Sequence, residues 1–132
     1  MRERASVIII QSGKVICIER YKNGRGPFYV LPGGGIEENE TPIDAARREI
    51  KEELGLEISE LHLIEGAPFA YKDHPAGDWV FIATIDSSDV PVWQEEHKQR
   101  PNNQYRVVGL SFKEVSEFET YPINLSELVA RL

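Results

Sequence analysis

Cysteine is almost absent from this sequence, in which Cys17 is the single one among 132 residues. One cysteine cannot form an internal disulfide or a cysteine metal site, so we expect a reducing, cytoplasmic location. Long apolar runs are lacking too, and the N-terminal run from Val7 to Ile10 has only four residues. A membrane span needs ~20 apolar residues and a signal peptide needs a longer core, so neither is predicted here.

Positive charge is in short supply, because 15 Lys and Arg face 22 Asp and Glu and leave a net charge of −7. This balance opposes binding to nucleic acid polymers or to anionic membrane surfaces. It remains compatible with small phosphorylated ligands if a divalent cation intervenes. The length and the 41% hydrophobic content predict a single domain over residues 1–132, and they indicate no particular oligomeric state.

Short apolar segments separated by turn residues predict strands in the first quarter of the chain. Residues 5–10 and 15–18 flank the turn signal at 12–14 and predict a β-hairpin. Residues 21–27 are polar and rich in glycine, which predicts a loop. Residues 28–31 then form a short predicted strand that stops at a proline.

A helix over residues 42–54 is the best-defined element. Thr41 is a good N-cap, Pro42 suits the first helical position, and Gly55 suits the C-terminal stop. One apolar stripe at helical spacing is made by four residues, which are Ile43, Ala46, Ile50 and Leu54.

The second half of the chain predicts more strands and one further helix. We expect strands mainly over 58–70, 79–85 and 105–112, loops over 71–77 and 86–103, and a C-terminal helix over 125–132 capped by Asn124. The order ββ-β-α-ββ-β-α predicts an α/β (α+β) domain with a mixed sheet.

Three carboxylates share one face of the predicted helix, because Glu49, Glu52 and Glu53 are spaced i, i+3, i+4. Their mutual repulsion would be relieved by a hard divalent cation, which prefers oxygen ligands. The alternative is a solvated acidic helix. Just before the helix, Gly33–Gly35 could offer carbonyl oxygens to a cation and N–H groups to phosphate, or could be a simple turn.

Residues 34–56 read GGIEENETPIDAARREIKEELGL. This segment resembles the Nudix box, which is Gly, five residues, Glu, seven residues, then Arg-Glu-apolar-x-Glu-Glu-x-Gly-apolar. Every specified position is filled at the right spacing, by Gly34, Glu40, Arg48, Glu49, Ile50, Glu52, Glu53, Gly55 and Leu56. By this resemblance the sequence is identified as a member of the MutT-like Nudix hydrolase family.

The resemblance implies an α/β/α sandwich around a mixed sheet and the hydrolysis of a nucleoside diphosphate linked to another moiety X. It also implies Mg²⁺ or Mn²⁺ held by Glu49, Glu52 and Glu53, with the Gly33 carbonyl as an added ligand. Arg48 would brace the site. The short chain favours a (d)NTP or another compact nucleotide, and a dinucleoside polyphosphate is the alternative substrate. The alternative function is a catalytically silent Nudix-fold module that binds and senses a nucleotide.

The general base is either a box glutamate or a later carboxylate, since Glu95 or Glu96 lies where some relatives place a late glutamate. The alternative is a solvated pair of loop residues. Candidate phosphate contacts come from the glycines and from loop cations, namely Gly34, Gly35, Arg20, Lys22 and Arg25.

Contacts with the moiety X can be proposed only loosely from the sequence. Tyr71 resembles a tyrosine of dinucleoside polyphosphate-cleaving relatives, and Asn124 resembles a purine-reading asparagine, although it also suits a helix cap. Further aromatic residues could stack on a base or belong to the core, namely Phe28, Tyr29, Trp79, Trp93 and Tyr105. Cys17 is expected to be a small core residue.

Overall fold

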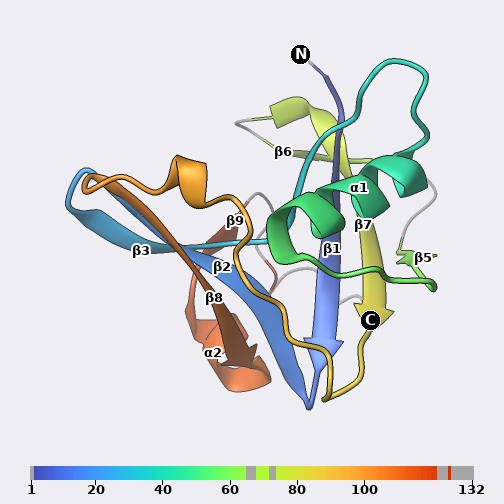
Figure 1. The fold of residues 1–132 in the computed structure, drawn as a ribbon. Coiled ribbons are helices and arrows are strands. Elements are labelled where there is room, and N and C mark those ends of the chain that lie inside the picture. Colours follow the sequence, from blue (N-terminus) through green and yellow to red (C-terminus); the bar gives the residue numbers. More distant parts are fainter. Residues whose placement is uncertain (1, 65–67, 72–73, 122–124, 126–132) are drawn as a thin grey trace.

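The computed structural model describes residues 2–64, 68–71, 74–121 and 125 (Figure 1). Strands dominate the described residues, and the elements follow in the order β1 (Arg4–Gln11), β2 (Lys14–Lys22), β3 (Arg25–Val30), β4 (Gly33–Gly35), α1 (Pro42–Leu54), β5 (His62–Leu63), β6 (Phe69–Tyr71), β7 (His74–Thr84), the 3-10 helix η1 (Glu96–Lys98), β8 (Asn103–Ser111), α2 (Phe112–Glu117) and β9 (Thr120–Tyr121). No helix in these ranges is long and apolar enough to cross a membrane.

The sheet is mixed and curls because β1 has two partners along one edge. On its other edge β1 pairs in parallel with β7, from Arg4↔Asp78 to Ile10↔Thr84. Along the shared edge, β4 pairs with the first residues of β1 and β2 pairs with the last ones. From there β2 runs between β3 and β8, so the sheet continues away from β1 (Figure 1).

Both faces of the sheet are buried, which explains the unbroken apolar run in β1. Val7 and Ile9 pack in one core cluster with the apolar stripe of α1. Ile8 points the opposite way and packs in a second cluster with Val115 of α2. The two helices therefore cover opposite faces, and the predicted α/β/α layering around a mixed sheet is confirmed.

The predicted central helix is confirmed with its bounds, Pro42–Leu54. Thr41 Oγ1 accepts a hydrogen bond from the Asp44 amide at 3.3 Å, and Gly55 ends the helix in the left-handed conformation with φ 69°. Ile50 is buried on the face that packs against the sheet. The box glutamates Glu49, Glu52 and Glu53 lie on the face of α1 that is beside this apolar stripe.

The predicted loop over 21–27 is wrong, because β2 and β3 continue into a tight hairpin there. Asn23 and Gly24 form its turn with φ of 52° and 74°. Two residues of positive φ match the twist of antiparallel strands, and Asn-Gly is the strongest short hairpin signal. The glycine stretch Gly33–Gly35 is likewise a strand, β4, rather than a turn.

Other boundaries differ in the second half of the chain. Within 58–70 the described strands are only β5 and the first residues of β6, and β7 begins at His74 instead of Trp79. The short helix α2 was not predicted, although Ser111 and Glu114 form a complete capping box at its start. The expected C-terminal helix and its cap Asn124 lie outside the described residues, apart from the buried Leu125.

Candidate active site

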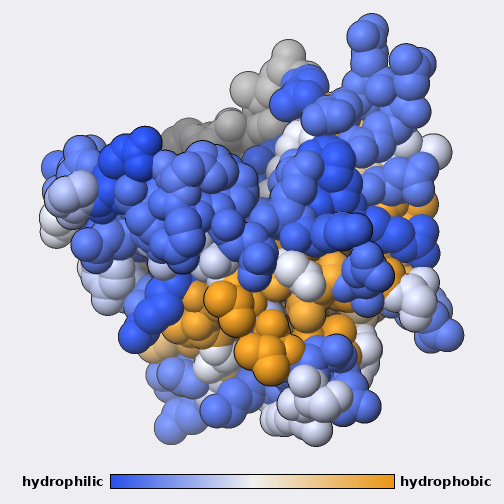
Figure 2. Space-filling model, in the orientation of Figure 1, coloured by the Kyte–Doolittle hydropathy of each residue, from blue (hydrophilic) through white to orange (hydrophobic). Residues whose placement is uncertain are grey.

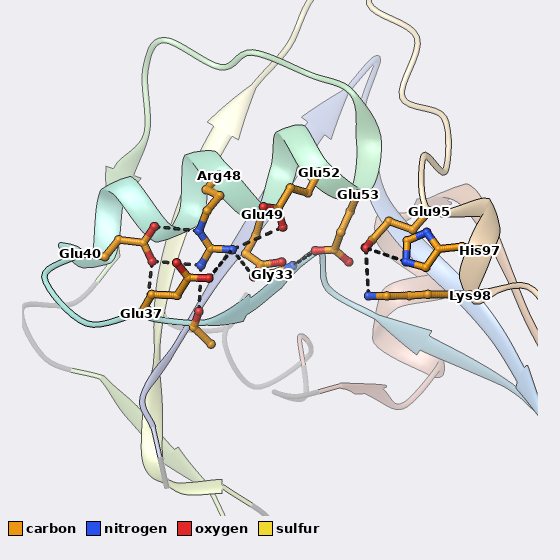
Figure 3. A network of polar contacts seen from close by, with 11 residues as sticks. Gly33, Glu37, Glu40, Arg48, Glu49, Glu52, Glu53, Glu95, His97 and Lys98 are labelled. Carbon is orange, nitrogen blue, oxygen red and sulfur yellow. Dashed lines mark hydrogen bonds and ion pairs between the residues drawn. The ribbon is translucent and has the colours of Figure 1, made fainter.

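The guanidinium of Arg48 is the centre of a polar network on α1 (Figure 3). It donates to both oxygens of Glu40, from Nε at 2.7 Å and from Nη2 at 3.0 Å. Nη2 also donates to the Gly35 carbonyl at 3.0 Å. Nη1 donates to Glu49 at 2.9 Å and to Glu52 at 3.4 Å. Arg48 thus ties the helix to β4 and to the loop between them, and all three of its nitrogens are engaged.

The ion pair between Arg48 and Glu40 is strongly charged on both sides. Hydrogen bonds from Arg48 hold the pKa of Glu40 at about 2, and the same contact raises the pKa of Arg48. Glu40 Oε1 also accepts the backbone N–H of Glu37 at 3.0 Å, which fixes the turn before the helix. These two box residues therefore hold the loop and the helix together.

Gly34 makes room for a carboxylate. A Cβ placed on Gly34 would lie 2.4 Å from the carboxyl carbon of Glu49. Gly33 is equally confined, since its Cβ would lie 2.7 Å from the Cα of Ser6 in β1. A side chain on the box glycine would thus push the Glu49 carboxylate out of its place, a role that the sequence did not predict.

Glu53 is a buried carboxyl, with only 8% of the residue exposed. Its Oε1 accepts the backbone N–H of Gly33 at 2.9 Å. The pKa of Glu53 is raised to about 8, mainly by burial and in smaller part by the negative charges of Glu49 and Glu95, while the Gly33 hydrogen bond opposes the rise. Burial also raises the pKa of Glu49, although Arg48 opposes that change. The site therefore holds two carboxyl groups, Glu49 and Glu53, whose negative charge is not fully stabilised by the surrounding protein.

The segment before η1 docks on the C-terminal end of α1. The backbone N–H of Gln94 donates to the Glu53 carbonyl at 2.8 Å, and that of Val92 donates to the Leu54 carbonyl at 3.3 Å. Trp93 Nε1 donates to the Glu95 carbonyl at 3.0 Å. These contacts bring the Glu95 side chain, which is 17% exposed, toward Glu53 (Figure 3).

The two late glutamates are placed differently. The charge of Glu95 acts on both Glu49 and Glu53, raising their pKa values, so Glu95 belongs to the carboxylate cluster. Glu96 is exposed at the start of η1. The structure therefore brings Glu95, and not Glu96, to the box glutamates.

Lys98 is a site residue that the sequence reasoning missed. Its Nζ lies 3.1 Å from both carboxylate oxygens of Glu95 (Figure 3). Its positive charge also acts on Glu53 and lowers the pKa of that carboxyl. The i, i+3 spacing of Glu95 and Lys98 was the available signal, because such pairs meet on one helical turn.

Two aromatic candidates for base stacking are used by the fold instead. The rings of Trp93 and Tyr105 are stacked at 4.5 Å between centroids with an interplanar angle of 6°. Arg20 lies over the Tyr105 ring at 5.1 Å and donates from Nε to Asn103 Oδ1 at 3.0 Å. Tyr105 is thus already in contact with both Trp93 and Arg20. This stack also engages Arg20, whose phosphate contact stays a prediction.

The remaining candidates lie in several places. Tyr29 stacks on Phe118, Phe28 meets Tyr121 edge-on, and Trp79 Nε1 donates to Glu3. Lys22 and Arg25 are exposed beside the hairpin turn. Tyr71 ends β6, and Asn124 lies outside the described residues. Cys17 is buried, as expected for a core residue, and burial raises the pKa of its thiol to about 12.

The carboxylate donors fit a hard divalent cation by their chemistry. Within the described ranges, no three carboxylate, imidazole or thiol groups are gathered tightly enough to hold a metal ion as they stand. Within these ranges, the side chains of Glu49 and Glu52 accept hydrogen bonds only from Arg48. The side chain of Glu53 accepts one from the Gly33 N–H. The three side chains offer carboxylate oxygens from one face of α1, and oxygen is the ligand that Mg²⁺ and Mn²⁺ prefer.

The surroundings of the cluster are polar. Figure 2 shows hydrophilic residues over α1, and apolar residues gathered below it on the same face. A groove of about 760 Å³ lies elsewhere, on β2, β8 and residues 99–101, and none of the box glutamates lines it. The candidate active site is therefore built on the carboxylate cluster between α1 and η1, and the groove begins at Gln99, directly after η1.

Comparison with known proteins agrees with these observations. The NUDIX domain family model matches residues 1–131. The 8-oxo-dGTP diphosphatase of Proteus vulgaris is 34% identical over 81 residues, which are 61% of this chain and 72% of that protein. Nucleoside triphosphatase NudI of Enterobacter sp. (strain 638) is 39% identical over 77 residues, 55% of this chain and 52% of that protein, so the match spans about half of that relative.

The fold is shared with solved structures as well. A MutT structure from a study of the Aliivibrio salmonicida and Vibrio cholerae proteins superposes with a TM-score of 0.70 at 18% identity. The match covers 98% of this chain and 93% of that one. Since the family model spans nearly the whole chain and the box is intact, the protein belongs to the Nudix family of hydrolases.

Proposed function

We propose that this Nudix hydrolase is a divalent-cation-dependent pyrophosphohydrolase whose substrates are (d)NTPs or other compact nucleotides. Family membership makes the chain a hydrolase of phosphoanhydride bonds. Glu53 carries the finer proposal, because it is a buried carboxyl with its pKa raised to about 8 beside Glu49 and Glu95. A protein keeps such a group at a cost in stability, and a bound cation would offset that cost.

The proposed cation ligands are the three box glutamates Glu49, Glu52 and Glu53, with the Gly33 carbonyl as a further candidate. When bound, Mg²⁺ or Mn²⁺ neutralises phosphate charge and polarises the phosphorus centre. The chain supplies the orientation. The Gly33 N–H holds Glu53 at 2.9 Å, and Arg48 holds Glu49 at 2.9 Å. Arg48 is thus a positioning residue, braced in turn by Glu40.

Glu95 is the proposed general base. Its carboxylate lies beside Glu53 on a segment that is hydrogen-bonded to α1, so a water attacking phosphorus there would be within its reach. Glu96 is exposed and has no comparable position. We therefore assign proton acceptance to Glu95 and a solvated role to Glu96.

The names of the two sequence relatives favour nucleoside triphosphates as the first substrates to test, because one is called an 8-oxo-dGTP diphosphatase and the other a nucleoside triphosphatase. A dinucleoside polyphosphate is the alternative. Gly34, Gly35, Arg20 and Arg25 remain proposed phosphate contacts. Tyr71 and Asn124 remain proposed contacts of the moiety X.

The test is a substrate panel with defined metal content. Purified protein is incubated with dNTPs, NTPs, 8-oxo-dGTP and diadenosine polyphosphates in Mg²⁺, in Mn²⁺ and in EDTA, and the products are separated by ion-exchange chromatography. We expect hydrolysis with either cation and none in EDTA. Equal turnover in EDTA would refute cation dependence. Tight nucleotide binding by calorimetry without any hydrolysis would instead support the sensing module.

A further inference from the structure

We infer that Lys98 is a phosphate-binding residue of this active site, whose ammonium contacts the polyphosphate of the substrate while it holds Glu95. The inference rests on the proposed function, since it concerns the same carboxylate cluster. It adds a residue that lies outside the Nudix box and that the sequence did not single out.

Lys98 places a positive charge next to Glu95, at the η1 side of the carboxylate cluster. Nζ lies 3.1 Å from each oxygen of Glu95, and the charge of Lys98 reaches Glu53. The Lys98 side chain is 47% exposed, whereas that of Glu95 is 17% exposed. The ammonium therefore touches the carboxylate cluster from a side chain that is still partly open to solvent, so an incoming nucleotide could reach it.

Lys98 also has hydrogen-bonding capacity left, unlike Arg48. Arg48 directs all three of its nitrogens to protein oxygens. An ammonium has three donors, and the two oxygens of Glu95 take at most two of them. Lys98 can thus bind a phosphate oxygen without giving up its contact with Glu95.

The segment that carries Lys98 is built into the fold. The Lys98 amide donates to the Glu95 carbonyl at 2.9 Å, which forms the η1 turn. The Gln94 amide bonds to Glu53 in α1, and Trp93 stacks on Tyr105 of β8. These contacts hold η1 at a fixed place beside α1. The backbone of Lys98 is therefore fixed next to the site.

The hydrolytic step gives such a cation a function. The oxygen of water forms a bond to one phosphorus, the bridging P–O bond breaks, and its electron pair stays on the leaving phosphate oxygen. The proton of the water passes to the Glu95 carboxylate. Negative charge therefore grows on the leaving phosphate as the bond breaks, and a fixed ammonium beside it stabilises that charge. A lysine acts here as a point charge.

Binding of inorganic pyrophosphate tests the inference apart from turnover. Calorimetry in Mg²⁺ compares the wild type with Lys98→Gln, Lys98→Arg and the control Lys113→Gln, which removes one exposed positive charge from α2. We expect Lys98→Gln to weaken pyrophosphate binding about 10-fold or more, as for loss of a charged hydrogen bond. Lys98→Arg should stay within a few-fold of the wild type, and Lys113→Gln should match it.

Turnover then separates the two proposals. With a substrate from the panel, Lys98→Gln should lower kcat/KM about 10- to 100-fold while thermal unfolding stays near that of the control. A lysine that only positions Glu95 would lower kcat and leave pyrophosphate binding unchanged. Equal pyrophosphate affinity in the wild type and Lys98→Gln, or no binding by the wild type, would overturn the inference. Lys98-dependent binding by a protein that hydrolyses nothing would refute the proposed function alone.

Discussion

Replacing Glu53 by glutamine should make the cation-free protein more stable and the enzyme inactive. Burial holds the pKa of Glu53 at about 8 in the folded state, against an ordinary value of 4.5. An acid whose pKa is raised by folding stabilises the fold only while it is protonated. Its contribution is therefore fully present below pH 4.5 and is lost progressively as the pH rises to about 8.

The magnitude follows from 1.36 kcal/mol for each tenfold change in the ionisation constant. Between pH 4.5 and pH 7 the wild type should lose about 3 kcal/mol of unfolding free energy through this group alone. Glutamine does not titrate, has nearly the same volume, and its oxygen can still accept the Gly33 N–H. In EDTA, Glu53→Gln should thus exceed the stability of the wild type by about 3 kcal/mol or more at pH 8, and by much less at pH 5.

Urea unfolding followed by tryptophan fluorescence, at pH 5, 7 and 8 in EDTA, measures this difference. Glu52→Gln is the matched control, because its side chain is 51% exposed and its replacement should change stability by less than about 1 kcal/mol. Added Mg²⁺ should stabilise the wild type at pH 8 more than Glu53→Gln. If Glu53→Gln is as stable as, or less stable than, the wild type at pH 8 in EDTA, ionisation of Glu53 does not lower the unfolding free energy. That result would refute the proposed cost of the buried carboxylate.

Four further substitutions test the core under α1 and neighbouring parts of the site. Ile50→Ala should lower the unfolding free energy by about 2–5 kcal/mol in urea, because this side chain is fully buried under α1. Glu95→Gln should lower kcat by about 10²–10⁴-fold with partial recovery at high pH, whereas Glu96→Gln should match the wild type in the same assay. Equal activity of both would place the base among the box glutamates. Gly34→Ala should lower activity more than thermal stability, because its Cβ displaces the Glu49 carboxylate.

The helix was predictable from sequence because its signals are local. Thr41, Pro42 and Gly55 act within one turn of the residues they cap, and the structure keeps those bounds. The spacing of the glutamates also placed them on one face. The hairpin at Asn23-Gly24 had an equally local signal, and the prediction failed there because polarity and glycine content were weighed above turn chemistry.

The meeting of Glu53 with Glu95 and Lys98 could not be derived in the same way. It depends on a loop far along the sequence docking on the end of α1 through the backbone N–H of Gln94. No periodicity records such a contact, and only the family resemblance pointed to that loop. The burial that raises the pKa of Glu53 is equally a tertiary property, since it follows from β4 and residues 92–95 closing over the helix.

The excess of negative charge in the carboxylate cluster links the raised pKa of Glu53, the proposed cation and the position of Lys98. Its carboxylates outnumber its cations, because Glu40, Glu49, Glu52, Glu53 and Glu95 lie beside Arg48 and Lys98, with Arg2 acting on Glu40. Arg48 is already committed to the Glu40 brace, so the excess negative charge falls on the glutamates that face the substrate. Protonation of Glu53 relieves part of that excess in the absence of a cation, and a divalent ion would relieve it without a proton. Polyphosphate would add further negative charge, and Lys98, which keeps a donor to spare beside Glu95, is placed to offset part of it.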